Sequence, residues 1–521
     1  MRGFGNVLGG AWGALVLVAL VAFSLAPDLH FRQAAGGDWV FMGFPVVPQD
    51  HIQYGGFIAQ ARDDHALLLK NEFTPEPQEG RYVFLNFTLA GLLARVLPLD
   101  IPVLFTVFRL VFVLGLFALM VQVFRRLLGT PTIWPALALF FLGGGTLGWF
   151  AALAPSSWTS APIFSDALQN PWSWFVPFTH FIGMWVPSLL LSVGFFSLAA
   201  RQRTTGTTAA LCLLALLIYF LHPYTGIFVF FQAGLAFLFE TLSTRRPPWG
   251  RYLPLAIPAL VILAYLFWAH HDQVFAITAG HTFRWKNSYS PLLWPLAYGP
   301  LLLLAAASLP LRQSSASPLY RQFLLAALAG LILSVNPFMA GVKFQMLFSF
   351  FLAILAAAGF QSLLTRVSRP RLLATAVLLF ALCDSLLGLG QLLSDQRNFK
   401  LMYLRKGEVQ ALDYLRQRPA GVTMSDYAPG LYLPWKARKT SFVSHWFLTI
   451  DYFKKGRLFL DFFGPAPLPE KEAILRDYHI RYILFSRFER PYGAVDPRLP
   501  VTKVFENPDA QVFEVTPPPP P

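Results

Sequence analysis

The sequence predicts a polytopic α-helical membrane bundle that carries a small α/β domain at its C-terminal end. Hydrophobic residues make up 55% of the 521 residues, and the mean hydropathy is +0.51. Charged residues make up only 13%, about half of the share that is usual in soluble domains. About 11 apolar runs have the length of membrane-spanning helices. This composition excludes an ordinary soluble enzyme, a coiled coil and a disordered chain.

The first apolar run has two possible interpretations. A basic Arg2 followed by an apolar stretch is typical of a signal peptide. No small-residue cleavage site ends the run, however, and we therefore expect a retained first helix. The predicted spans are 7–26, 103–124, 131–152, 180–200, 207–222, 224–244, 252–270, 291–310, 322–338, 341–362 and 372–393.

The arginines predict the orientation of the bundle. They gather after alternate spans, as in Arg125, Arg201 and Arg366, and basic loops stay in the cytoplasm. Residues 82–97 form an apolar run that is short for a span, and counting it as one would place Arg125 outside. We therefore expect 82–97 to be an interfacial helix, with the N-terminus inside and the C-terminus outside.

The predicted domains follow from this topology. Residues 1–393 form the transmembrane domain, with a first outer loop at 27–81. Residues 394–516 have a mixed composition that predicts an extracytoplasmic α/β domain, and the prolines 517–521 predict an unstructured tail. Within 394–516 the pattern indicates helices near 408–416, 458–463 and 470–478, and strands at 481–486 and 511–515.

Charge and cysteine content exclude some partners. The net charge of +14 follows from basic cytoplasmic loops, and no nucleic-acid motif accompanies it. We therefore expect the lipid bilayer, and no nucleic acid, as a partner. Cys212 and Cys383 lie inside apolar runs and are interpreted as core residues.

The first outer loop contains the strongest candidate for catalysis. Asp50 and Tyr54 are four residues apart, so a helix places both on one face. A carboxylate there can take a proton from an acceptor hydroxyl. The alternative is that Asp50 only caps the helix, since Asp is a favoured N-cap residue.

Other acids occur in the predicted outer loops. Glu72, Glu76 and Glu79 precede the run 82–97, and each is either a second acid near Asp50 or part of a solvated loop. Asp166 lies among tryptophans in the next outer loop, which also suits an interfacial belt. Asp50 and Asp166 could share a divalent cation, but two residues do not define a metal site.

Cationic residues at the outer ends of the helices are candidates for holding a phosphate group. His222, Arg284 and Lys343 are the candidates by position. The alternative for each is a side chain that snorkels to the membrane surface.

Several short motifs together resemble the GT-C superfamily of integral-membrane glycosyltransferases. That superfamily includes protein O-mannosyltransferases and aminoarabinose transferases, and the sequence resembles its uncharacterised bacterial members most. The motifs are Asp50-His-x-x-Tyr54 with Ala61-Arg62, Asn71-x-Phe-Thr-Pro-Glu76 with Gly80, Gly144-Gly-Thr-Leu-Gly-Trp149, His222-Pro-Tyr224, Ser444-His-Trp-Phe-Leu-Thr449 and Arg481-Tyr-Ile-Leu.

The resemblance implies a function and a set of site residues. It implies transfer of a sugar from a polyprenyl-phosphate donor to an extracytoplasmic lipid, glycan or protein, in the bacterial inner membrane. Asp50 would be the base, with Asp166 and Glu76 as further acids and Tyr54 and Arg62 in support. Lys343, Arg284 and His222 would bind the donor phosphate. No metal site or resident cofactor is predicted, although a divalent cation is compatible.

Two other functions remain open from the sequence. A lipid or glycan transporter would show inverted repeats and polar residues at the midplane of several spans, and we find no repeat. A non-catalytic protein of envelope assembly would use the C-terminal domain to bind a partner.

Overall fold

The structure is a computed structural model, and it divides into two compact units that are described separately. It describes the chain except residues 1, 46, 130–131, 144–145, 147–148, 150–151, 154–184, 202–203, 285–292, 310–316, 339–340, 395–398 and 517–521. The first unit comprises Met1–Pro27, Phe105–Ala264 and Arg284–Ser394. The second comprises Asp28–Leu104, Tyr265–Phe283 and Asp395–Pro521.

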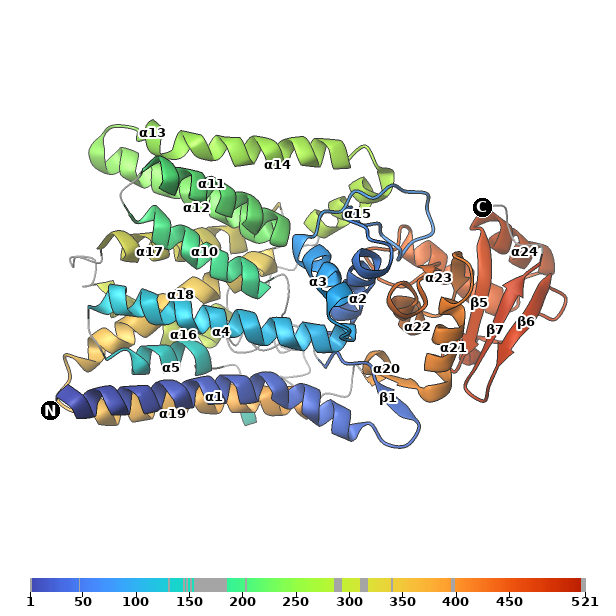
Figure 1. Ribbon diagram of the computed structural model, residues 1–521, viewed down its shortest axis with the longest axis horizontal. Coiled ribbons are helices and arrows are strands. Elements are labelled where there is room, and N and C mark those ends of the chain that lie inside the picture. Colours follow the sequence, from blue (N-terminus) through green and yellow to red (C-terminus); the bar gives the residue numbers. More distant parts are fainter. Residues whose placement is uncertain are drawn as a thin grey trace. The chain divides into compact units, whose positions relative to one another are not determined.

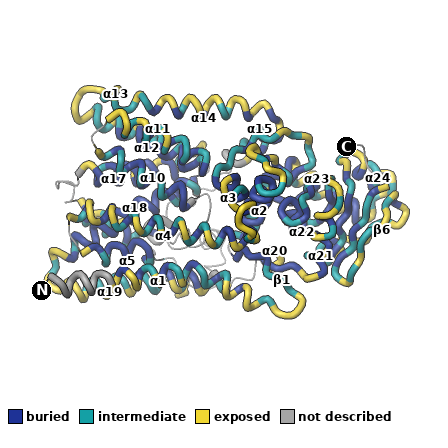
Figure 2. The backbone as a smooth tube through the Cα atoms, viewed as in Figure 1, coloured by how far each residue is buried: buried dark blue, intermediate teal, exposed yellow. Residues whose placement is uncertain are grey.

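The first unit is a helical bundle (Figure 1). Helix α18 lies at its centre and packs against α17, α16 and α5, and 94% of the most apolar 18-residue window within Lys343–Leu364 is buried. By contrast, only 22% of the corresponding window within Trp249–Ala269, which contains α14, is buried, and Figure 2 shows this helix largely exposed. The helices are α1 (Arg2–Ala34), α4 (Ile101–Leu128), α5 (Trp134–Leu142), α10 (Trp185–Ala199), α11 (Thr205–Leu221), α12 (Pro223–Thr244), α13 (Trp249–Tyr252), the 3₁₀ turn η1 (Leu253–Leu255), α14 (Ala256–Ala269), α16 (Leu293–Ala306), α17 (Ser317–Ser334), α18 (Gly341–Leu364) and α19 (Pro370–Ser394).

These helices make the chain an integral membrane protein. Every predicted apolar run contains a helix, because long apolar stretches satisfy their backbone only in this way inside a bilayer. Among the described residues, six helices are long and apolar enough to cross a membrane. The predicted count of about 11 crossings, and the orientation, stay predictions.

The second unit joins distant parts of the chain. Strand β1 (Trp39–Phe41) pairs antiparallel with β2 (Tyr403–Arg405), so the segment after α1 is tied to the C-terminal region. The predicted boundaries of the domains stay predictions. The remaining elements outside the sheet are α2 (Pro48–Asp63), α3 (Leu85–Val96), α15 (Gln273–Arg284), α20 (Phe399–Met402), α21 (Lys406–Arg416), α22 (Tyr427–Tyr432), the π-helical turn η3 (Leu433–Ala437), α23 (Tyr452–Phe463), α24 (Leu468–Asp477) and the 3₁₀ turn η4 (Arg490–Tyr492).

A five-stranded sheet confirms the α/β character of the C-terminal region. Its order is β4-β3-β5-β7-β6, with β3 parallel to β4 and β5, and β7 antiparallel to β5 and β6. Phe459, Phe462 and Phe463 of α23 pack with Ile480 and Ile483 of β5 in one core. The strands are β3 (Val422–Met424), β4 (Thr440–Ser441), β5 (Ile480–Ser486), β6 (Val501–Glu506) and β7 (Ala510–Val515). The predicted proline tail lies outside the described residues.

Candidate functional site

Asp50 lies in the first turn of α2. Val47 is the N-cap residue with φ 42°, and Pro48 occupies the first helical turn, where its fixed φ suits the helix. No side chain caps this end, so the interpretation of Asp50 as the N-cap is wrong. As the third helical residue, Asp50 instead has its carboxylate near the positive end of the helix dipole.

A buried histidine faces this carboxylate. The Nε2 atom of His445 lies 3.6 Å from Oδ1 of Asp50. The His445 side chain has no exposed surface, whereas 20% of the Asp50 side chain is exposed. Neither ring nitrogen of His445 has a hydrogen bond within the described part of the chain. Asp50 is therefore the member of the pair that a substrate can reach, and His445 can act only through it.

Hydrogen bonds between two distant loops hold His445 in place. Residues 71–74 form hydrogen bonds with residues 448–450, which are more than 370 positions later in the sequence. The carbonyl oxygen of His445 accepts a hydrogen bond from the Thr449 N–H at 2.8 Å. The Phe73 ring lies 6.4 Å from the imidazole in an edge-to-face arrangement. The bonds run from Asn71 Nδ2 to the Leu448 carbonyl (2.7 Å), from Thr449 Oγ1 to the Phe73 carbonyl (2.8 Å) and from the Ile450 N–H to Thr74 Oγ1 (3.0 Å).

Two glycines let α2 approach these loops closely. A Cβ atom on Gly55 would lie 3.1 Å from the Trp435 ring of η3, and one on Gly56 would lie 3.0 Å from the Phe73 ring. A β-carbon at either position would require the Trp435 or Phe73 ring to shift by a few tenths of an ångström. The two glycines thus allow a tight fit of α2 against these rings.

Tyr54 and Arg62 lie further along α2. Tyr54 is buried and its ring is stacked on Phe87, with centroids 4.8 Å apart. Burial, and secondarily the Asp50 charge, raise the pKa of the Tyr54 hydroxyl well above its usual value, so it stays protonated. Arg62 pairs with Asp63 at 2.7 Å in the last turn of α2, at the opposite end from Asp50.

The three glutamates of the first outer loop have partners within the second unit. Glu72 pairs with Arg438 at 2.7 Å. Glu76 forms an ion pair with Lys455, a lysine that is only 1% exposed. Glu79 pairs with Arg81. Each glutamate therefore has a structural role, and a catalytic role for Glu76 stays a prediction.

The predicted phosphate-binding residues lie in the first unit or outside the described part. His222 is buried at the turn between α11 and α12, and its Nδ1 atom lies 2.6 Å from the Thr225 hydroxyl. Lys343, in the first turn of α18, is near enough for its charge to act on His222. The side chain of Arg284 and all of Asp166 lie outside the described residues. The predicted convergence of these groups with Asp50 stays a prediction.

The described residues were compared with the ligand sets that metal ions need. No group of three or more His, Cys, Asp or Glu side chains there could hold a metal ion. A cation shared by Asp50 and Asp166 stays a prediction, because Asp166 is not among the described residues.

His445 is not among the site residues that the sequence predicts. The motif Ser444-His-Trp-Phe-Leu-Thr449 contributes only to the family resemblance. A lone histidine between aromatic residues has no local pattern that marks it as a site. Its significance comes from Asp50, which lies 395 positions earlier in the sequence and meets it only through the fold.

Comparisons with known proteins identify the fold. No family model and no curated protein sequence matches this chain. Among solved structures, ArnT from Cupriavidus metallidurans bound to undecaprenyl phosphate is similar with a TM-score of 0.54 and 13% identity, covering 100% of both chains. Arabinofuranosyltransferase AftD from Mycobacteria is similar with a TM-score of 0.55 and 13% identity, covering 97% of this chain and 40% of that one.

A third structure is the oligosaccharyltransferase AglB from Archaeoglobus fulgidus with an inhibitory peptide and a dolichol-phosphate. It has a TM-score of 0.46 and 12% identity, and the match covers 91% of this chain and 69% of that one. The expected resemblance to GT-C glycosyltransferases is confirmed at the level of the fold.

Proposed function

We propose that this protein is a membrane glycosyltransferase that moves a sugar from a polyprenyl-phosphate-linked donor to an acceptor hydroxyl, with Asp50 as the base. The observation that carries the proposal is the partly exposed Asp50 carboxylate beside a fully buried His445, in a chain whose fold is similar to that of ArnT. ArnT is bound to undecaprenyl phosphate, and this supports a lipid-linked donor.

The proposed reaction is a substitution at the anomeric carbon. The acceptor oxygen forms the new bond to this carbon while its proton passes to Asp50. The bond between the anomeric carbon and the phosphate oxygen breaks, and the polyprenyl phosphate leaves with the electron pair. Lys343, His222 and Arg284 are the proposed partners of that phosphate, and Asp166 is a second proposed acid. We place the reaction on the outer side of a bacterial inner membrane.

The test is the substitution Asp50→Asn in the purified full-length protein. The amide keeps the shape of the side chain but accepts no proton, so transfer from a radiolabelled polyprenyl-phosphate sugar to membrane acceptors is expected to fall about 10²–10⁴-fold. The melting temperature is expected to change little, since Asn keeps the shape of the side chain and the lost helix-dipole interaction contributes only about 0.3–1 kcal/mol. Asp64→Asn is the matched control, because Asp64 lies at the other end of α2 with 54% of its side chain exposed.

A second variant tests the role of His445 as a positioning residue. Gln in place of His445 can still donate a hydrogen bond towards Asp50, whereas Ala cannot. The proposed role of His445 is to hold the Asp50 carboxylate, 3.6 Å from its Nε2 atom, in the reactive position. His445→Gln is therefore expected to keep most of the kcat, and His445→Ala is expected to lower the kcat with little change in KM.

The outcomes of the two variants separate the possibilities. An Asp50→Asn protein that melts like the wild type and transfers sugar at a normal rate would remove Asp50 as the base. Glu72 and Glu76 would then be the next acids to replace. Equal losses of kcat and of melting temperature in His445→Gln and His445→Ala would give His445 a purely structural role.

A further inference from the structure

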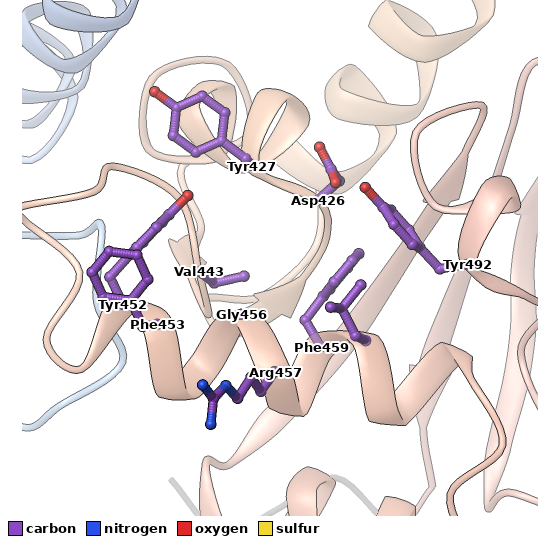
Figure 3. Close-up of a pocket in the computed structure, with 10 residues that line it drawn as sticks. Asp426, Tyr427, Val443, Tyr452, Phe453, Gly456, Arg457, Phe459 and Tyr492 are labelled. Atoms are coloured by element: carbon purple, nitrogen blue, oxygen red, sulfur yellow. The ribbon is translucent and has the colours of Figure 1, made fainter.

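A pocket in the second unit has no role in the function proposed so far. Its volume is about 440 Å³, and it lies between α22, α23 and η4 (Figure 3). Asp426, the N-cap residue of α22, contributes a carboxylate. The other walls are mainly aromatic, and they include Tyr427, Tyr452, Phe453, Phe459 and Tyr492.

Two of the five aromatic rings that line this pocket are exposed. Phe453 is 83% exposed and Tyr492 is 42% exposed. Tyr492 stands edge to face on Phe459, with centroids 5.5 Å apart, and Tyr452 stands in the same way on Phe453 at 5.4 Å. Apolar ring surface in a concave site is typical of a binding site for a ligand that covers it.

The polar groups of the pocket favour a ligand rich in hydroxyl groups. The Asp426 carboxylate acts electrostatically on both Tyr452 and Tyr492, so the three groups share one space. Burial, together with Asp426, raises the pKa of both phenols, which leaves them protonated and able to donate. Figure 3 shows the Arg457 guanidinium directed away from this space. The carboxylate lies inside the pocket, and Arg457, the cation among the described lining residues, is directed away from it. This arrangement disfavours a phosphate or another anion.

Tyr427 connects the pocket with Asp50. Its hydroxyl donates to Oε1 of Gln49 at 2.9 Å, and Gln49 is the residue before Asp50 in α2. The charge of Asp50 also acts on this hydroxyl. Tyr427 therefore links the wall of the pocket to the first turn of α2, which carries the proposed base.

We propose that this pocket binds a neutral sugar ring of the acceptor. A pyranose offers a C–H face that covers aromatic rings and a rim of hydroxyls that donate to Asp426 and accept from Tyr452 and Tyr492. Only the assignment of this sugar to the acceptor rests on the proposed function. With that assignment, the acceptor is a saccharide or a molecule that carries one.

The test measures binding without turnover. Saturation-transfer NMR would record methyl glucoside, galactoside and mannoside on the purified full chain in detergent. A dissociation constant of about 1 mM is expected for the preferred sugar, given its ~13 non-hydrogen atoms. Phe453→Ala and Tyr492→Ala are expected to weaken binding at least tenfold. Phe505→Ala, on the edge strand β6 and outside the pocket lining, is the matched control and should bind as the wild type does.

The results also distinguish this proposal from the proposed function. Asp50→Asn should bind the sugar as the wild type does. If this variant also transferred sugar at a normal rate, the role of Asp50 in the proposed function would be overturned, while the proposal that the pocket binds a sugar would stand. Failure of all three sugars to bind at about 20 mM would overturn the pocket proposal. Sugar binding that is unchanged in Phe453→Ala and Tyr492→Ala would also overturn it. So would a saturation-transfer signal from a short peptide when the three sugars give none. Phe453 is exposed, so its removal does not threaten the fold.

Discussion

Glu489 is a fully buried carboxyl group just behind the pocket. It accepts hydrogen bonds from the N–H and hydroxyl of Ser486, both at 2.7 Å, and from the Asp426 N–H at 2.6 Å. Burial nevertheless raises its pKa from the ordinary 4.5 to about 7. The folded chain therefore binds a proton in the range from about pH 4.5 to 7 that the unfolded chain has released.

This residue predicts a pH-dependent stability of the second unit. The folded state binds more protons than the unfolded state in that range, so the free energy of unfolding falls as the pH rises from about 4.5 to 7. The loss is about 3 kcal/mol, since each pKa unit corresponds to about 1.4 kcal/mol. Thermal unfolding in detergent should show a melting temperature that declines over this range, and Glu489→Gln should reduce the decline.

A matched variant separates this effect from general charge effects. Glu506 on β6 is exposed, and its hydrogen bond with Lys503 lowers its pKa, so Glu506→Gln should leave the decline unchanged. An undiminished decline in Glu489→Gln would show that another group is responsible.

Among the elements, α2 and α3 are packed through a glycine. A Cβ on Gly91 would lie 2.4 Å from the Ala61 Cβ and 2.7 Å from the Ile58 carbonyl oxygen. Real β-carbons do not come this close to backbone atoms, so the helices would have to separate. The opposite face of α3 is apolar and exposed, as at Leu89 and Val96. That face suits the predicted interfacial position of this helix.

Gly91→Ala is therefore expected to lower stability by about 1–3 kcal/mol, the usual cost of overpacking. Gly456→Ala is the matched control: this glycine is also inside a helix, and nothing lies within 4 Å of its added Cβ. The control should melt at or above the wild-type temperature, because Ala favours a helix over Gly by about 1 kcal/mol. Equal melting of wild type and Gly91→Ala would contradict the close packing of α2 on α3.

At the scale of the whole molecule, orientation in the membrane remains to be measured. The arginine pattern predicts residue 126 inside and residue 490 outside. Single cysteines at these positions, in a chain with Cys212 and Cys383 replaced by Ala, should react differently with an impermeant maleimide. Residue 490 should label in intact cells and residue 126 only after permeabilisation. Labelling of residue 126 from outside would invert the predicted topology.

The helices of the bundle were predictable from the sequence because their apolar runs are long and local. The strands were less so: β5 and β7 have a clear pattern, but β3 has three residues and β4 two. The pairing of β1 with β2 joins Trp39 to Arg405, and nothing local marks either strand as a partner.

The site shows the same limit. Asp50 could be selected from its position in a predicted helix, whereas His445 and the ion pair of Glu76 with Lys455 depend on contacts across the whole chain. Such contacts leave no periodicity in a single sequence.

The bonds between residues 71–74 and 448–450 also have a consequence for the order of synthesis. The partners Phe73 and Thr449 are 376 residues apart, and a ribosome adds about 5–20 residues per second. The loop that contacts the segment with Asp50 is therefore synthesised about 20–75 s after that segment. During that time Asn71 and Thr74 lack the partners that they have in the finished chain. A product terminated after Ser394 but before His445 would contain all the helices of the bundle and never acquire the Asp50–His445 pair.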